Sequence, residues 1–326
     1  MAPCVSVIIP NFDLKTGLFT QNVLKWTKAK NVDIDRFQIV VVTPRMSFVD
    51  NQTLTILLRE GDEIVEVSDT ENDNSMWNAG ALKSKHEYLL FVEGHVTPDE
   101  NFLHNMLNYI EINSEAKAVN TISSNSKESE FELLMDRWFD ETLKLRAESH
   151  SFTFLTRQCF MLKKSVFERY GPILSNFEQF GPPYLSYKLA ENHVMIETVN
   201  FSDLIHENEN TIYNHHSATR SYIRGYVRAK NQNDIELMNR YFGTNPDLAK
   251  VDLRLRQLIN RRSPFLLLRI KSGFILRKLK IFGIEFVIMK INIGLRLKYI
   301  WLKKAHKLVV VDQYEHELLK GFRGHG

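Results

Sequence analysis

The amino-acid sequence predicts an α/β protein with a mostly parallel sheet flanked by helices. Short β-branched apolar runs alternate along the first hundred residues with segments of helical periodicity. The predicted strands are 5–9, 37–42, 63–67 and 88–92, and the predicted helices between them are 14–29, 54–59 and 76–82. Such β-α-β alternation favours parallel strands with helices on both faces of the sheet.

Each predicted element has a local reason. The first strand is β-branched and ends at Pro10, and the second ends at Thr43-Pro44. The first helix repeats its apolar residues at helical spacing: Leu18, Phe19, Val23, Leu24 and Trp26. Farther along the chain, 131–146 is a charged amphipathic segment typical of a helix, and 154–162, 194–199 and 204–206 are predicted as strands.

Composition bounds the class of protein. With 326 residues, 44% of them hydrophobic and 25% charged, the chain can bury a substantial core in one large domain and still carry an appendage. Cys4 and Cys159 lack metal-type spacing and form no disulfide framework, which suits a reducing compartment. The N-terminus lacks the basic region of a signal peptide, and no run of 18 uncharged apolar residues predicts a membrane span.

The turn Glu93-Gly94-His95 is the first candidate site. It follows the apolar strand 88–92 directly and precedes the helix-start signal 97–100. Ligands of open α/β sheets collect beyond the carboxyl ends of strands, so an acid and a histidine placed there are suited to hold a metal ion and its phosphates. The alternative interpretation is a β-turn with two solvated polar residues.

Three stretches carry a resemblance to a known family. They are VSVIIPNFD, FQIVVVTP and NDNSMWNAGALKSKHEYLLFVEGHVTPD, and in order and spacing they resemble the nucleotide-sugar-binding half of a family 2 glycosyltransferase with the GT-A fold. The resemblance covers roughly residues 5–228. It implies a GT-A-like sheet and sugar transfer from a nucleoside diphosphate sugar, with inversion by a single displacement as the family's default.

The resemblance also implies a metal site. Glu93-Gly94-His95 stands where the family has its D-x-D motif, and His206, at the end of a later strand, would complete the site. A divalent cation, Mn²⁺ or Mg²⁺, is therefore expected, and the imidazoles move the preference toward Mn²⁺. For His206 the alternative is an ordinary packed or surface histidine.

Donor binding is the next implication. The residues expected at the nucleotide sugar are Pro10, Asn11, Asp13, Asp69, Asn78, Gly80 and Arg224. The family's acidic residue after the second strand is Thr43-Pro44 here, which Asp13 or Asp69 would replace, and its arginine before N-x-G is Trp77. For Asp69 and Asn72 the alternative is helix capping and turn chemistry.

The resemblance further implies a catalytic base just before the helix that contains 184–189. That position reads Gly181-Pro182-Pro183, and Glu178 is the nearest carboxylate, so Glu178 is the candidate base, with a surface loop acid as the alternative. Arg220, Arg224 and Arg228 are spaced by four and would share a helix face, either toward a diphosphate or toward solvent.

The C-terminal segment has a different character. Residues 251–310 hold 15 basic and 2 acidic residues, a net charge of +13, so the rest of the chain carries about −10 against a total of +3. We expect a glycosyltransferase domain at 1–235 and a basic amphipathic helical tail at 236–326. Aliphatic and aromatic residues alternate with basic ones in this tail, which favours an anionic membrane surface, with a packed helical hairpin as the alternative. Nucleic-acid binding is disfavoured, because no recognition motif accompanies the aromatic residues.

Together these features predict a nucleotide-sugar-dependent hexosyltransferase of polysaccharide or glycan biosynthesis. Its acceptor would be a saccharide or a lipid-linked saccharide. The enzyme would be located in the cytoplasm or on the inner face of the membrane. The alternatives are a catalytically degenerate relative that binds a sugar nucleotide or a partner enzyme, and a membrane-associated scaffold.

Overall fold

The structure is a computed structural model. It describes residues 2–11, 16–45, 51–68, 72–122, 124–125, 154–199, 204–207, 221–222, 224–229 and 231–232. The chain divides into two units, Met1–Asp234 and Ile235–Gly326, and the described residues all belong to the first. The predicted helix 131–146 and the basic tail lie outside the described residues, so the predicted domain boundary at 235 stays a prediction.

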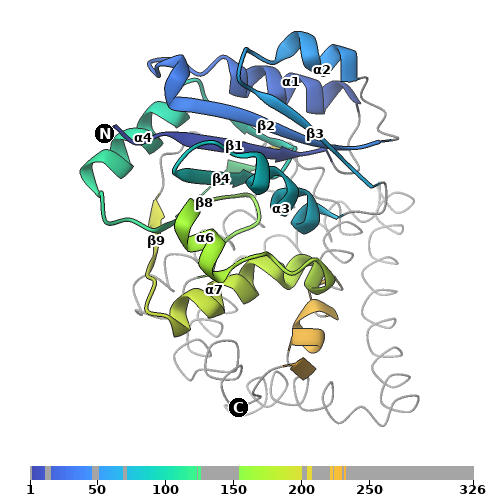
Figure 1. The fold of residues 1–326 in the computed structure, drawn as a ribbon, viewed down its shortest axis with the longest axis vertical. Helices are drawn as coiled ribbons and strands as arrows, with labels where there is room; N and C mark the ends of the chain where they lie inside the picture. The colour runs from blue at the N-terminus through green and yellow to red at the C-terminus, as the bar shows by residue number, and fades with distance from the viewer. Residues whose placement is uncertain are drawn as a thin grey trace, which may run out of the picture. The chain divides into compact units, whose positions relative to one another are not determined.

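A seven-stranded sheet forms the centre of the first unit (Figure 1), with the strand order β3-β2-β1-β4-β8-β6-β9. Its strands are β1 (Val5–Pro10), β2 (Phe37–Pro44), β3 (Glu63–Val67), β4 (Tyr88–Val92), β6 (Ala118–Thr121), β8 (Cys159–Lys163) and β9 (Ile196–Val199). Only β8 pairs antiparallel with its neighbours in this sheet. The predicted mostly parallel α/β sheet is therefore confirmed.

Helices cover both faces of the sheet (Figure 1). They are α1 (Thr16–Thr27), α2 (Asn51–Leu57), α3 (Asp73–Lys83), α4 (Phe102–Ile112), α6 (Lys164–Tyr170) and α7 (Gly181–Glu191), with 3-10 turns η1 (Ile34–Arg36) and η2 (Ser175–Phe180). Side chains alternate across a strand, so Val7 and Ile9 of β1 pack in the core cluster of α1, α2 and α4, whereas Ile8 packs in that of α3, α6 and α7.

A second, three-stranded sheet bears directly on the site. It has the order β5-β10-β7, with β5 at Val96–Pro98, β10 at Leu204–His206 and β7 at Ser124–Asn125. The helix start predicted at 97–100 is therefore displaced: Val96–Pro98 pairs antiparallel with β10, and α4 begins only at Phe102. The strand predicted from Phe154 likewise begins only at Cys159.

Gly80 lets α3 lie against the sheet. A Cβ atom added at Gly80 would lie 2.4 Å from Cγ2 of Ile8 on β1 and 2.9 Å from Cγ2 of Val42 on β2. Real Cβ atoms do not approach carbon this closely, and both neighbours are buried β-branched side chains that cannot move aside freely. This glycine is thus required by helix-sheet packing.

We expect Gly80→Ala to lower the free energy of unfolding by about 1–3 kcal/mol, because it overpacks the contact between α3 and the sheet. The exposed Leu82 of the same helix provides the control, since Leu82→Ala should change stability by less than about 0.5 kcal/mol. Urea unfolding followed by circular dichroism measures both values. Equal stability of the Gly80→Ala variant and the wild type would contradict the packing role.

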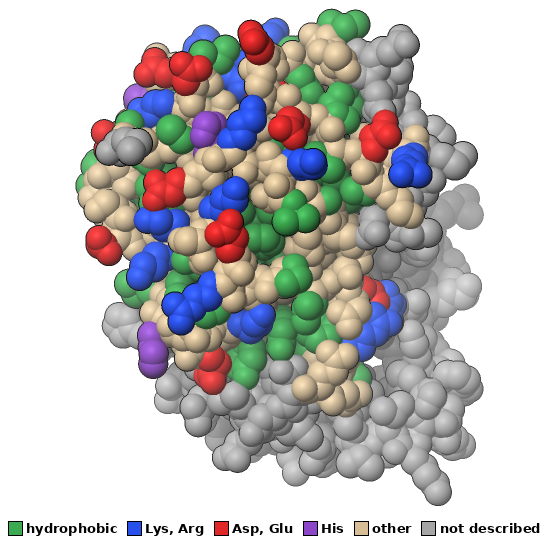
Figure 2. Space-filling model, viewed as in Figure 1, with side chains coloured by type: hydrophobic (Ala, Val, Ile, Leu, Met, Phe, Trp, Pro, Cys, Tyr) green, Lys and Arg blue, Asp and Glu red, His purple; other side chains and the backbone are tan. Residues whose placement is uncertain are grey.

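The visible surface mixes both signs of charge. On the face drawn in Figure 2, Lys and Arg side chains are interspersed with Asp and Glu side chains over the described residues. Among the helices of the described residues, none combines the length and the apolar character needed to cross a bilayer.

Candidate active site

The turn Glu93-Gly94-His95 connects the carboxyl end of β4 to β5. Two different parts of the chain hold its backbone: the Glu93 N–H donates to the Gln158 carbonyl (3.1 Å), and Asn22 Nδ2 on α1 donates to the Gly94 carbonyl (3.0 Å). The Trp26 indole N–H, also on α1, donates to the Val96 carbonyl (3.2 Å). The turn is therefore fixed by packing before any ligand binds.

Strand β10 brings His206 to this turn. His206 pairs with Val96 in the antiparallel β5–β10 ladder, and the following Glu207 N–H donates to the His95 carbonyl at 2.9 Å. Because neighbouring strands lie about 5 Å apart, this register places the His206 side chain beside His95. Residues separated by 111 positions in the sequence thus share one site.

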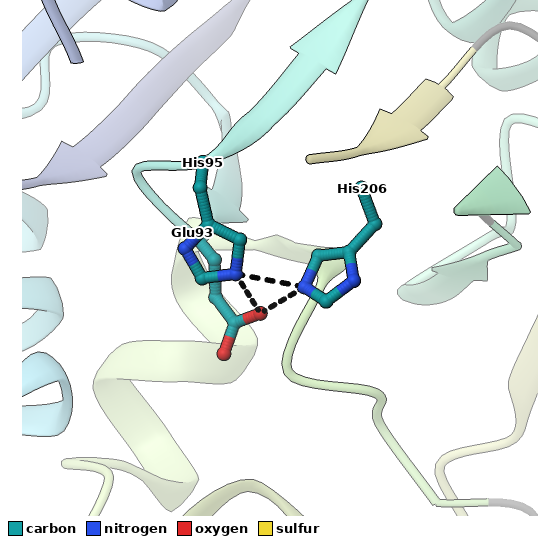
Figure 3. Close-up of side chains that lie close together, drawn as sticks. All are labelled: Glu93, His95 and His206. Atoms are coloured by element: carbon teal, nitrogen blue, oxygen red, sulfur yellow. Dashed lines mark hydrogen bonds and ion pairs between the residues drawn. The ribbon is translucent and has the colours of Figure 1, made fainter. Parts of the chain in front are cut away.

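The side chains of Glu93, His95 and His206 converge on one point (Figure 3). The two Nε2 atoms are 2.8 Å apart, and Glu93 Oε2 lies 3.2 Å from His206 Nε2 and 3.5 Å from His95 Nε2. Atoms bound at about 2.1 Å to a common metal ion are separated by about 3.0–3.4 Å, so this donor set fits a divalent cation with little movement. Two imidazoles and one carboxylate are ligands that Mn²⁺ and other transition metals accept more readily than Mg²⁺.

Electrostatics keep Glu93 and His95 in protonation states that can bind a metal ion. Burial alone would raise the pKa of Glu93, but the hydrogen bond with His206 and the charges of His95 and Arg157 lower it well below its usual range. Burial, together with the His206 charge, lowers the pKa of His95 to about 4. At neutral pH the carboxylate is therefore ionised and the His95 imidazole neutral, as a metal ligand must be.

Arg157 adds a positive charge beside the three converging side chains. Its Nε donates to Glu93 Oε1 at 3.2 Å, and its guanidinium also forms an ion pair with Asp73 and lies over the Trp77 ring, 5.2 Å from the centroid. In the sequence, Arg157 interrupts the apolar residues of the predicted strand 154–162. That interruption was the available signal, because an arginine entering a buried strand needs an acidic partner. The partners themselves, Asp73 and Glu93, could not be identified from the sequence.

Glu178 lies at a second cluster of charges. Its φ of +49° is rare for a residue with a side chain, and its carbonyl accepts a 2.7 Å hydrogen bond from Asn74 Nδ2. Its carboxylate accepts hydrogen bonds from Ser221 Oγ (2.7 Å), from Arg224 Nε and Nη2, and from Arg228 Nη1 (2.7 Å). The hydrogen bond from Arg224 is the main cause that lowers the pKa of Glu178, against the opposing effect of burial.

Arg224 and Arg228 lie on one face of the helical residues 224–229, as their spacing of four predicts. That face meets the Glu178 carboxylate, a partner that the spacing did not identify. Close approach of this segment to η2 depends on Gly225, where an added Cβ would lie 1.8 Å from the Phe177 carbonyl oxygen. Arg220 lies outside the described residues.

The residues expected at the nucleotide have the following places. Pro10 ends β1, and Asn11 donates from Nδ2 to Thr43 Oγ1 at 3.2 Å. Asn78 exchanges two hydrogen bonds with the backbone of Ile173, and Gly80 faces the sheet. Their contacts are thus structural, and contacts with a nucleotide stay a prediction. Asp13 and Asp69 lie outside the described residues.

The capping alternative is correct for Asn72, whose side chain accepts from the Ser75 N–H and caps α3. Trp77 is buried in the core, and its indole N–H donates to the Val92 carbonyl at 3.0 Å.

A model of "Glycosyl transferase family 2" matches residues 58–171, about a third of the chain, which contain Glu93, His95 and Arg157. No curated protein sequence matches the chain. Among solved structures, the mannosyltransferase PcManGT from Pyrobaculum calidifontis, in complex with GDP-Man and Mn²⁺, is similar over 92% of this chain and 88% of its own, with a TM-score of 0.60 and 12% identity. Residues 58–171 therefore match the family 2 glycosyltransferase model, and the chain shares the GT-A fold of the solved mannosyltransferase.

Proposed function

We propose that the protein transfers a hexose from a nucleoside diphosphate sugar to a saccharide or lipid-linked acceptor, with a divalent cation held by Glu93, His95 and His206. The observation that carries this proposal is the convergence of these three side chains beyond the carboxyl end of β4. Mn²⁺ is the proposed ion, because two of the three donors are imidazole nitrogens. The Mn²⁺ and GDP-Man bound by the similar mannosyltransferase support this assignment and make GDP-mannose the first donor to test.

The protein's own residues supply the rest of the proposed mechanism. When bound, the cation neutralises charge that develops on the departing diphosphate. Arg224, which is half exposed, is proposed to exchange its ion pair with Glu178 for one with the donor diphosphate. Glu178, released from Arg224, then takes the proton from the acceptor hydroxyl as that oxygen attacks the anomeric carbon. A single displacement of this kind inverts the configuration of the sugar.

The pathway and the cellular location of the enzyme can also be proposed. We propose that the enzyme works in polysaccharide or glycan assembly at the cytoplasmic face of the membrane. The basic amphipathic segment within 236–326 supports this location through its charge and its alternation of apolar with basic residues.

Calorimetric titration of the full-length protein with GDP and with UDP, each with and without Mn²⁺, tests the proposed donor site. We expect one nucleotide to bind only when Mn²⁺ is present, because Glu93, His95 and His206 would hold the ion and its positive charge would attract the diphosphate. Mg²⁺ should support weaker binding than Mn²⁺. Absence of nucleotide binding under every condition would contradict the proposal and favour a degenerate relative that has lost turnover.

A further inference from the structure

We propose that Arg157 is a positioning residue for the metal site, which holds the Glu93 carboxylate so that only one of its oxygens faces the ion. This inference rests on the proposed function, since it assumes that Glu93 is a metal ligand. It concerns a residue outside the three converging side chains, contributed by the segment that leads into β8.

The two oxygens of Glu93 have different partners. Oε1 accepts a hydrogen bond from Arg157 Nε at 3.2 Å, whereas Oε2 lies 3.2 Å from His206 Nε2 and 3.5 Å from His95 Nε2. A carboxylate with both oxygens free can rotate or bind a cation through both of them. With Oε1 engaged by Arg157, Glu93 presents Oε2 alone to the point where the imidazoles converge.

Arg157 is itself held rigidly. Its Nη2 forms an ion pair with Asp73, its Nη1 donates to Asn74 Oδ1 at 3.3 Å, and its side chain is 13% exposed. Asp73 and Asn74 both belong to the first turn of α3, which Asn72 caps. The guanidinium therefore has a separate partner on each of its three nitrogens, and its planar fork suits this arrangement better than the single ammonium of lysine.

The same contacts connect the metal site to the loop of the proposed base. Asn74, which accepts from Arg157 through Oδ1, donates through Nδ2 to the carbonyls of Leu174 and Glu178. Arg157 also places a positive charge between the half-buried carboxylates of Asp73 and Glu93. Loss of Arg157 therefore changes both the orientation of Glu93 and the charge around it.

Residues that orient metal ligands typically contribute about 10- to 100-fold to metal affinity. We expect Arg157→Gln to weaken Mn²⁺ binding by about this factor, measured on the full-length protein by titrating Mn²⁺ and following the electron paramagnetic resonance signal of the free ion. Arg157→Lys keeps the positive charge but loses the planar guanidinium that bonds three partners. Its Mn²⁺ affinity should therefore lie between that of Arg157→Gln and that of the wild type.

Arg59 offers a matched control. It is similarly buried (17% exposed), forms an ion pair with Asp62 and lies 3.8 Å from the centroid of the Phe37 ring, but it precedes β3, which is separated from β4 by two strands. Arg59→Gln should lower thermal stability and leave Mn²⁺ affinity within twofold of the wild type. A purely structural role for Arg157 would instead make the two glutamine variants alike in both measurements.

The outcomes separate this inference from the proposed function. If the wild type binds Mn²⁺ and Arg157→Gln binds it equally well, Arg157 does not position Glu93, and the metal site stands without it. If the wild type binds no Mn²⁺, the proposed metal site fails and the role of Arg157 with it. Should Arg157→Gln not fold, Arg157→Lys decides the question, because affinity equal to that of the wild type would overturn the inference.

Discussion

His206→Ala is expected to lower kcat/KM for sugar transfer with Mn²⁺ by about 100-fold or more. In the proposed metal site His206 would supply one of three protein ligands. A bound cation contributes several kcal/mol to stabilising the charge of the leaving diphosphate, and about 1.4 kcal/mol corresponds to a tenfold change in rate. Initial rates measured over a range of Mn²⁺ concentrations test this expectation. Higher Mn²⁺ should restore part of the lost activity, because Glu93 and His95 remain as ligands.

His104 provides a control of the same residue type. Its ring nitrogens form hydrogen bonds with the Asn31 carbonyl and with the Asn108 side chain on α4. His104 is not one of the three side chains that converge at the proposed metal site. His104→Ala should therefore keep both the activity and the Mn²⁺ dependence of the wild type. Equal activity of His206→Ala and His104→Ala would show that His206 is not a ligand of a catalytic ion.

Glu178→Gln is the second change with a large expected effect. If Glu178 is the base, this substitution should lower kcat by about 10²–10⁴-fold, because the amide keeps the size of the side chain but cannot accept the acceptor's proton. Binding of the nucleotide, measured by calorimetry, should be at least as tight as in the wild type, because Arg224 no longer has to leave an ion pair with Glu178. Glu111→Gln, at an exposed ion pair with Arg36, is the matched control and should leave kcat unchanged.

The pH dependence of kcat/KM adds a second test of Glu178. A base must be ionised, so activity falls as pH drops through its pKa in the free enzyme. The hydrogen bond from Arg224 lowers that pKa from its ordinary value of 4.5, so Glu178 should produce no acid limb between pH 5 and about pH 8. Arg224→Met removes the main lowering cause and should move the acid limb to higher pH. An unshifted acid limb would mean that Glu178 is not the titrating base.

Local sequence patterns predicted much of the fold and part of the site. The strands are short, apolar and bounded by turns, so the central sheet and the turn at Glu93 could be located from the sequence. The helix start at Thr97 was misplaced, because Val96–Pro98 pairs with a strand that comes more than a hundred residues later. No local pattern contains that information.

The ion pairs of Arg157 could not be predicted from the sequence for the same reason. Its partners Glu93 and Asp73 precede it by 64 and 84 positions, and only the folded sheet brings them together. Gly80 illustrates a related gap. The sequence shows the glycine, but the side chains of Ile8 and Val42 that require it become visible only when α3 is packed on β1 and β2.

Glu93, His95 and His206 are proposed to hold one divalent cation together. Anomalous X-ray scattering from a crystal of the full-length protein grown with Mn²⁺ tests this proposal most directly. We predict a single strong manganese peak within bonding distance of Glu93 Oε2 and of the Nε2 atoms of His95 and His206. A manganese peak elsewhere, or no peak at these three atoms under saturating Mn²⁺, would contradict the account.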